Sequence, residues 1–127
     1  MTLQKILIVQ NDFLLAEGLR IVIADAGYEV VGLARDTASA DKLAVQHRPV
    51  LAIVDMMLEV DVDGIATAKF LKEKHGLQIL ITTGFPDSFV EREGVHELAC
   101  AVVKKPYSDE EILEAVARCL NPPPAQP

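Results

Sequence analysis

The sequence predicts an α/β fold, a three-layer, doubly wound, five-stranded parallel sheet with helices on both faces. Five short apolar runs rich in Val, Ile and Leu follow one another along the chain, helical patterns separate them, and the connections are short. Strands that are covered on both faces read as nearly continuous apolar runs. Strands that alternate with helices form right-handed βαβ units. These three observations together predict the fold class.

The first two predicted strands enclose the most regular helical pattern of the chain. The runs KILIV (5–9) and EVVGLA (29–34) are the two strands. Gly27 follows the helical pattern and is placed to end it in a left-handed conformation. Apolar residues recur with the spacing of one helix face. They are Leu15, Leu19, Val22, Ile23 and Ala26, and we expect the first four to be core residues rather than a partner surface.

The other three strands are predicted at 50–54, 78–82 and 100–103. Side chains that can cap a helix precede the remaining helices. They are Asp36 or Thr37 for a helix through about His47, Asp63 for one through about His75, and Ser108 with Glu111 for the last. Between the fourth and fifth strands we expect only a short or mobile helix, because Phe89 and Val90 are the only strongly apolar residues from 86 to 93.

Length and charge limit the classes of function. The chain has 127 residues, which fits one domain at 1–120, followed by a proline-rich tail at 121–127. The formal net charge of -7 argues against direct binding to nucleic acid or to an anionic membrane, because both need clustered Lys and Arg. The apolar runs are also much shorter than a membrane span requires.

The two cysteines and the N-terminus bear on the compartment. Cys100 and Cys119 lie in apolar surroundings without the spacing of a metal or redox motif, so we expect two reduced thiols in the core. The N-terminus lacks the basic, apolar and small-residue regions of a secretory signal. Both observations favour the cytoplasm.

Polar residues follow four of the predicted strands at their carboxyl ends, which meet at one edge of a parallel sheet where ligands bind. Asp55 directly follows an apolar strand, and a carboxylate at the edge of a core needs a positive partner. Lys105 is the expected partner. The other residues at this edge are Gln10, Asn11 and Asp12 after the first strand and Thr83 and Gly84 after the fourth.

An acidic segment lies between the third strand and the third helix. Glu59, Asp61 and Asp63 fit a solvated loop with a helix cap better than a calcium loop, because the spacing of an EF-hand is missing.

These motifs resemble the receiver domain of bacterial two-component response regulators. The resemblance covers about residues 4–120 and implies a flavodoxin-like sheet with the strand order 2-1-3-4-5. The residues that carry it are the run KILIV, Asp55, Asp63-Gly64-Ile65, Thr83-Gly84 and Lys105-Pro106-Tyr107. Thr83-Gly84-Phe85 and Lys105-Pro106-Tyr107 are most similar to stand-alone receivers that are paired with sensor kinases of the HWE type.

The resemblance implies a role for each site residue. Asp55 would accept a phosphoryl group from the histidine of a sensor kinase or phosphotransfer protein, while Thr83 and Lys105 would each bind a phosphoryl oxygen. Mg²⁺ would bridge Asp55, the backbone carbonyl of Met57 and an acid near the end of the first strand. The signal would then pass to a downstream protein. Such a protein is a switch that catalyses at most its own phosphorylation and dephosphorylation.

Two positions depart from the family pattern. Gln10 and Asn11 stand where the family has an acidic pair, so we expect weak Mg²⁺ binding that uses Asn11 or Asp12. Asp12 can equally well be the N-cap of the first helix. Val102 stands where the family commonly has an aromatic residue. Because Val102 is short and stiff, we expect the switch to act through the segment 84–98 instead.

Three other functions compete with this interpretation. A pseudo-receiver, which binds partners without phosphorylation, would explain Gln10 and Asn11 but not the combination of Asp55, Thr83 and Lys105. A haloacid-dehalogenase-type phosphatase would need an Asp at the position of Met57. A flavodoxin would need a glycine- and hydroxyl-rich phosphate loop after the first strand.

Overall fold

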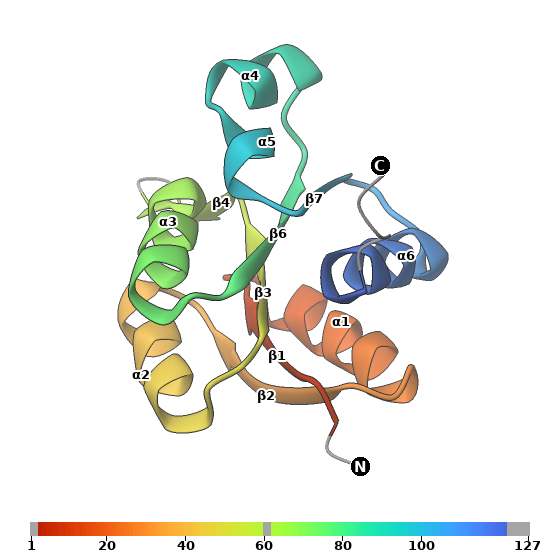
Figure 1. Cartoon of the computed structure of the whole chain (residues 1–127). Coiled ribbons are helices and arrows are strands. Elements are labelled where there is room, and N and C mark those ends of the chain that lie inside the picture. The colour runs from red at the N-terminus through yellow and green to blue at the C-terminus, as the bar shows by residue number, and fades with distance from the viewer. Residues whose placement is uncertain (1–2, 60–61, 122–127) are drawn as a thin grey trace, which may run out of the picture.

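The computed structural model describes residues 3–59 and 62–121, apart from the side chains of 58–63. Five strands form one parallel sheet in the order β2-β1-β3-β6-β7 (Figure 1). Their bounds are Lys5–Val9 (β1), Glu29–Ala34 (β2), Leu51–Asp55 (β3), Gln78–Thr83 (β6) and Ala101–Lys104 (β7). Numbered along the chain, this is the order 2-1-3-4-5, and each strand lies within one residue of its prediction. The predicted fold class is confirmed.

Helices cover both faces of the sheet (Figure 1). On one face lie α1 (Phe13–Asp25) and α6 (Asp109–Leu120), and on the other α2 (Thr37–His47) and α3 (Gly64–His75). Alternate residues of each strand serve the two faces. In β1, Ile6 and Ile8 pack with α1 and α6, whereas Leu7 and Val9 pack with α2 and α3. Two cores therefore share one sheet.

The helices begin at the capping residues that the sequence indicates. Asp36, rather than Thr37, caps α2 and accepts a hydrogen bond from the Ser39 backbone N–H at 2.8 Å. Ser108 and Glu111 form the predicted capping box of α6. After α1, Gly27 adopts a φ of 101°. The predicted cap at Asp63 concerns a side chain outside the described residues.

A short antiparallel ribbon replaces the acidic loop that the sequence predicts. Strands β4 (Met57–Glu59) and β5 (Val62–Asp63) pair with one another after β3. Asp61 and the side chains of Glu59 and Asp63 lie outside the described part of the chain. The ribbon was missed because its residues show neither the length nor the alternation of a strand.

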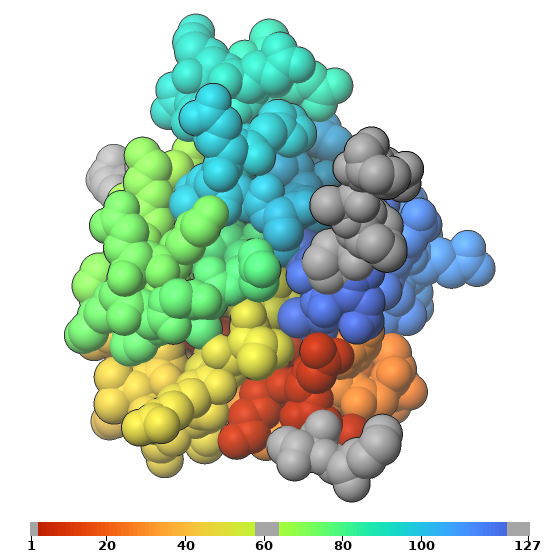
Figure 2. Space-filling view, viewed as in Figure 1, coloured from red at the N-terminus to blue at the C-terminus, as the bar shows by residue number. Residues whose placement is uncertain are grey.

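Two short helices, α4 (Asp87–Arg92) and α5 (Val95–Leu98), form the segment between β6 and β7. The predicted short helix is thus confirmed, although it is divided in two at Gly94, which has a φ of 69°. Val90 and Val95 are almost fully buried and attach the segment to the core on the α3 side. In the space-filling view of Figure 2 the turquoise part of this segment stands at the top of the molecule.

The apolar face of α1 is buried only in part, which corrects the prediction for Leu15. Leu19 and Ile23 are core residues, but Leu15 is 53% exposed and Val22 is half-buried. The physical reason is that α6 begins only at Asp109, so a groove remains beside the first turns of α1. None of the helices among the described residues is both long and apolar enough to cross a membrane.

Cys100 and Cys119 form a disulfide, so the prediction of two reduced thiols is wrong. The fold places Cys100 just before β7 and Cys119 in the last turn of α6, with their Cα atoms 5.4 Å apart. Sequence spacing alone could not show this proximity, which arises from the packing of α6 on the sheet. The cytoplasmic location, which rested partly on reduced thiols, remains a prediction.

Reduction of this disulfide is expected to destabilise the protein. The bond links residues that are 19 positions apart. Closing a loop of that length lowers the entropy of the unfolded chain and thereby raises the free energy of unfolding by about 3 kcal/mol. Urea unfolding with and without dithiothreitol measures the difference. The double variant Cys100→Ser/Cys119→Ser cannot form the bond, so we expect it to have about the stability of the reduced parent both with and without dithiothreitol. An equal response of parent and variant to the reductant would contradict the bond.

Candidate functional site

Asp55 is the last residue of β3 and lies at the carboxyl end of the sheet. The register pairs it with Thr82 of the neighbouring strand β6, and the Met56 N–H continues the ladder to the Thr82 carbonyl oxygen at 2.9 Å. Only 5% of Asp55 is exposed. A carboxylate in this position must be matched by donors from the protein.

Lys105 supplies the positive partner that the sequence predicts. Its backbone N–H donates to the Thr83 carbonyl oxygen at 2.8 Å, which fixes the residue at the end of β7. Its Nζ donates to Oδ2 of Asp55 at 2.5 Å. The Lys105-Pro106 peptide bond is cis. An ammonium therefore lies against the carboxylate.

Thr83 completes the predicted trio. It is fully buried, and it lines a cavity of about 350 Å³ together with Asp55, Met57, Phe85 and Lys105. Its Oγ1 accepts a hydrogen bond from the Phe85 N–H at 3.0 Å. The carboxylate, the hydroxyl and the ammonium thus converge on one small space at the sheet edge.

Gln10 also contacts Asp55, a contact that the sequence analysis did not predict. Its Nε2 donates to Oδ2 of Asp55 at 2.8 Å, beside the Lys105 ammonium. The other carboxylate oxygen, Oδ1, accepts the Met57 backbone N–H at 3.1 Å. The sequence shows a missing acid at residue 10, and only the folded arrangement shows that the amide there is a donor. Three donors therefore surround the carboxylate.

Two of the predicted Mg²⁺ ligands, Asn11 and Asp12, make no hydrogen bond to Asp55 among the described residues. Asp12 is the N-cap of α1, where its Oδ1 accepts the Leu15 N–H at 3.1 Å, so its alternative role is the one that the structure supports. Asn11 is exposed. The Gln10 atom that faces Asp55 is an N–H donor, whereas Mg²⁺ takes oxygen ligands. Across residues 3–59 and 62–121, no three His, Cys, Asp or Glu side chains are grouped as metal ligands would be. The residues as they lie do not fit a divalent cation.

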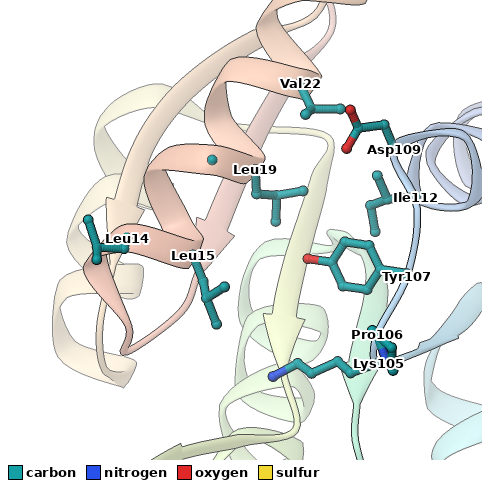
Figure 3. A pocket seen from close by; sticks show the side chains of 10 residues that line it. Leu14, Leu15, Leu19, Val22, Lys105, Pro106, Tyr107, Asp109 and Ile112 are labelled. Carbon is teal, nitrogen blue, oxygen red and sulfur yellow. The ribbon is translucent and has the colours of Figure 1, made fainter.

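An apolar groove of about 650 Å³ lies beside the site (Figure 3). Leu14 and Leu15 of α1 form one side, and Tyr107 and Ile112 form the other. Lys105 lines the groove as well as the smaller cavity, so the two spaces share its side chain. Leu14 is 80% exposed. The groove therefore offers an apolar surface within reach of the Asp55 site.

Tyr107 in this groove stays protonated at neutral pH. Burial raises the pKa of its hydroxyl above the ordinary value, and the negative charges of Asp55 and Asp109 raise it further. A neutral phenol adds no negative charge beside the carboxylate.

Known proteins with similar sequences are regulators. The chain is 29% identical over 113 residues to the transcriptional regulatory protein PdtaR of Mycobacterium tuberculosis. The aligned residues cover 89% of this chain and 55% of PdtaR. It is 24% identical over 117 residues to the phyllosphere-induced regulator PhyR of Methylorubrum extorquens. That alignment covers 91% of this chain and 43% of PhyR. The chain thus spans about half the length of the curated relatives that it matches.

The chain has the same fold as solved structures of receiver domains. The signal receiver domain of a modulated diguanylate cyclase from Desulfovibrio desulfuricans superposes with a TM-score of 0.82 at 28% identity, covering 94% of both chains. A CheY-like receiver domain protein from Methanospirillum hungatei gives a TM-score of 0.81 at 24% identity, covering 94% of this chain and 95% of its own. The family model of the response regulator receiver domain matches residues 6–117. The chain therefore belongs to the response regulator receiver domain family of two-component signalling.

Proposed function

We propose that this receiver is a phosphoacceptor, which takes a phosphoryl group onto Asp55 from the phosphohistidine of a sensor kinase or phosphotransfer protein. A carboxylate oxygen of Asp55 forms the new bond to phosphorus as the bond between phosphorus and the histidine nitrogen breaks. The products are an aspartyl phosphate and a free histidine. The protein acts as a switch in this reaction rather than as a turnover enzyme.

The observation that carries the proposal is the contact between Lys105 and the nearly buried Asp55, with Thr83 on the same cavity. Phosphoryl transfer depends mostly on positioning and on neutralising charge. The ammonium at 2.5 Å from the carboxylate lies where it can balance charge on an incoming phosphoryl oxygen. A scaffold that only binds partners has no physical need for this arrangement.

Small phosphodonors test the proposal without the kinase. The protein is incubated with phosphoramidate or acetyl phosphate, in parallel with Mg²⁺ and with EDTA, and its intact mass is measured. We expect the addition of one phosphoryl group to the parent and none to Asp55→Asn. Modification that persists in Asp55→Asn, or no modification of the parent under either condition, would contradict the proposal.

The groove beside α1 is the docking site that we propose for the phosphohistidine partner. A partner helix seated on Leu14 and Leu15 would lie next to Lys105, and thus next to Asp55. Exposed apolar surface near a reactive group is typical of protein interfaces. The pairing with a kinase of the HWE type remains a prediction from the motifs.

Leu14→Ser is expected to slow phosphotransfer from a phosphorylated histidine kinase by about fivefold or more, because one interface anchor contributes over about 1 kcal/mol. Reaction with phosphoramidate should change little, since this donor is too small to need the groove. Val45→Ser on α2 is the matched control, because Val45 is 59% exposed on the other face of the sheet. Equal transfer rates for Leu14→Ser and Val45→Ser would place the docking site elsewhere.

We propose that the signal leaves the site through Phe85. Thr83 Oγ1 accepts a hydrogen bond from the Phe85 N–H. The Phe85 ring stacks on the ring of Phe89 in α4, with 4.7 Å between the ring centroids. Lys104 Nζ donates to the Phe85 carbonyl oxygen at 2.6 Å. A phosphoryl oxygen that draws the Thr83 hydroxyl inward would release the Phe85 N–H. The loop and α4 would then change position, while Val102 stays in place. Amide exchange across 84–98, with and without beryllofluoride, measures this change.

The alternative function is that of a pseudo-receiver, which binds partners without phosphorylation. The observation that favours it is the pair Gln10 and Asn11 in place of acids. The mass measurement separates the two functions, because a pseudo-receiver stays unmodified.

A further inference from the structure

Gln10 is held in one orientation by its two neighbours. Its Oε1 accepts the Asp12 backbone N–H at 3.0 Å, and its Nε2 donates to Asp55 Oδ2 at 2.8 Å. A backbone N–H can only donate, and an ionised carboxylate can only accept. Rotating the amide by half a turn would set an oxygen against the carboxylate and an NH₂ against an N–H. The hydrogen-bond network therefore assigns the amide a single orientation.

This orientation places an N–H donor, rather than an oxygen ligand, against Oδ2 of Asp55. Asp55 Oδ2 receives hydrogen bonds from both Gln10 and Lys105, and Oδ1 receives one from Met57. An amide NH₂ cannot ligate a metal ion, and its hydrogens repel one. Cation binding at Oδ2 would require the Gln10 amide to turn away and lose both of its hydrogen bonds.

The local charge balance agrees with this arrangement. Asp55 carries one negative charge and Lys105 one positive charge, and they are in direct contact. With Gln10 and Asn11 neutral, this contact is already balanced. Acids at residues 10 and 11, as the family pattern has them, would add two negative charges that call for a divalent cation.

We propose that Gln10 is a positioning residue that supports the Asp55 carboxylate in place of a metal ion, so that the resting site does not bind Mg²⁺. The inference rests on the proposed function only in taking Asp55 as the phosphoacceptor. Mg²⁺ binding is typical of receiver domains, so this chain departs from the behaviour of its family. It also replaces the weak Mg²⁺ binding through Asn11 or Asp12 that the sequence suggests.

The isosteric variant Gln10→Glu tests the inference, because it keeps the shape of the side chain and replaces the donor by a second carboxylate. Gln78→Glu is the matched control: it makes the same charge change at an exposed residue at the opposite end of the sheet. Mg²⁺ is titrated into the parent and both variants by calorimetry, and melting temperatures are measured with Mg²⁺ and with EDTA.

We expect no response to millimolar Mg²⁺ from the parent or from Gln78→Glu. Gln10→Glu should melt lower than the parent in EDTA, recover in Mg²⁺, and bind Mg²⁺ at least about tenfold more tightly, because two carboxylates then face the ion. Millimolar or tighter binding by the parent would overturn the inference, even if Gln10→Glu failed to fold. A folded Gln10→Glu without gained affinity would overturn it too.

Phosphorylation by phosphoramidate gives a separate result. We expect the parent to be modified equally in Mg²⁺ and in EDTA, and modification that needs Mg²⁺ would contradict the inference. If the parent is modified in neither, the proposed phosphoacceptor function fails, whereas the calorimetric titration still decides whether the site binds Mg²⁺.

Discussion

Gly64→Ala is expected to destabilise the protein by at least about 3 kcal/mol, the upper end of the usual cost of overpacking. A Cβ at this position would collide with the carbonyl oxygen of Asp55 and lie 2.8 Å from the carbonyl group of Met56. Both obstacles are backbone atoms, which cannot move aside like the end of a side chain. The Gly64 N–H also donates to the Met56 carbonyl oxygen at 3.0 Å, so the close approach is part of the site.

Gly18→Ala is the control for this substitution. Gly18 lies within α1, and a Cβ there would meet nothing within 4 Å. We expect a gain of about 0.5–1 kcal/mol, because alanine loses less backbone entropy in a helix. Urea unfolding of both variants measures the contrast. A cost for Gly64→Ala of less than about 1 kcal/mol would mean that the backbone after β3 is less closely packed than described.

Lys105→Met is expected to lower the rate of phosphorylation by phosphoramidate on the order of a hundredfold, the typical cost of removing one preorganised charge-stabilising donor. The variant keeps an apolar stem of similar size and removes the ammonium from Asp55 Oδ2. Asp55 would retain the Gln10 and Met57 donors but no positive partner. Intact mass measured over time gives the rate.

Lys69→Met provides the comparison for the change in net charge, because Lys69 is exposed on α3. It should react at the rate of the parent. If Lys105→Met also reacts at that rate, the ammonium plays no part in transfer, and the role that the family resemblance implies for Lys105 does not hold here.

The sequence predicts the strands, helices and fold of this molecule well, because they depend on patterns among residues close together in the sequence. Buried strands of a parallel sheet are nearly continuous apolar runs, and Asp36 and Ser108 cap their helices through contacts with residues three positions away. The site residues Asp55, Thr83 and Lys105 could be brought together because the carboxyl ends of parallel strands meet at one edge.

Features that depend on distant contacts were missed. The disulfide requires the packing of α6 beside β7, and the exposure of Leu15 depends on where α6 begins. From the sequence alone, Gln10 indicates a missing metal ligand, because the sequence shows which groups a residue has but not which end of an amide faces a neighbour. The sequence signal for the contact is that Gln10, a polar residue, follows a predicted strand at the same sheet edge as the carboxylate of Asp55.

Chemical trapping shows whether Asp55 itself carries the phosphoryl group. Borohydride reduces an aspartyl phosphate to homoserine and leaves free carboxylates unchanged, so peptide mass spectrometry after treatment reports the modified residue. We expect homoserine at position 55, only after exposure to the phosphodonor and only in the parent protein. Homoserine at another aspartate, or a phosphoryl group retained on a residue that borohydride does not reduce, would contradict it.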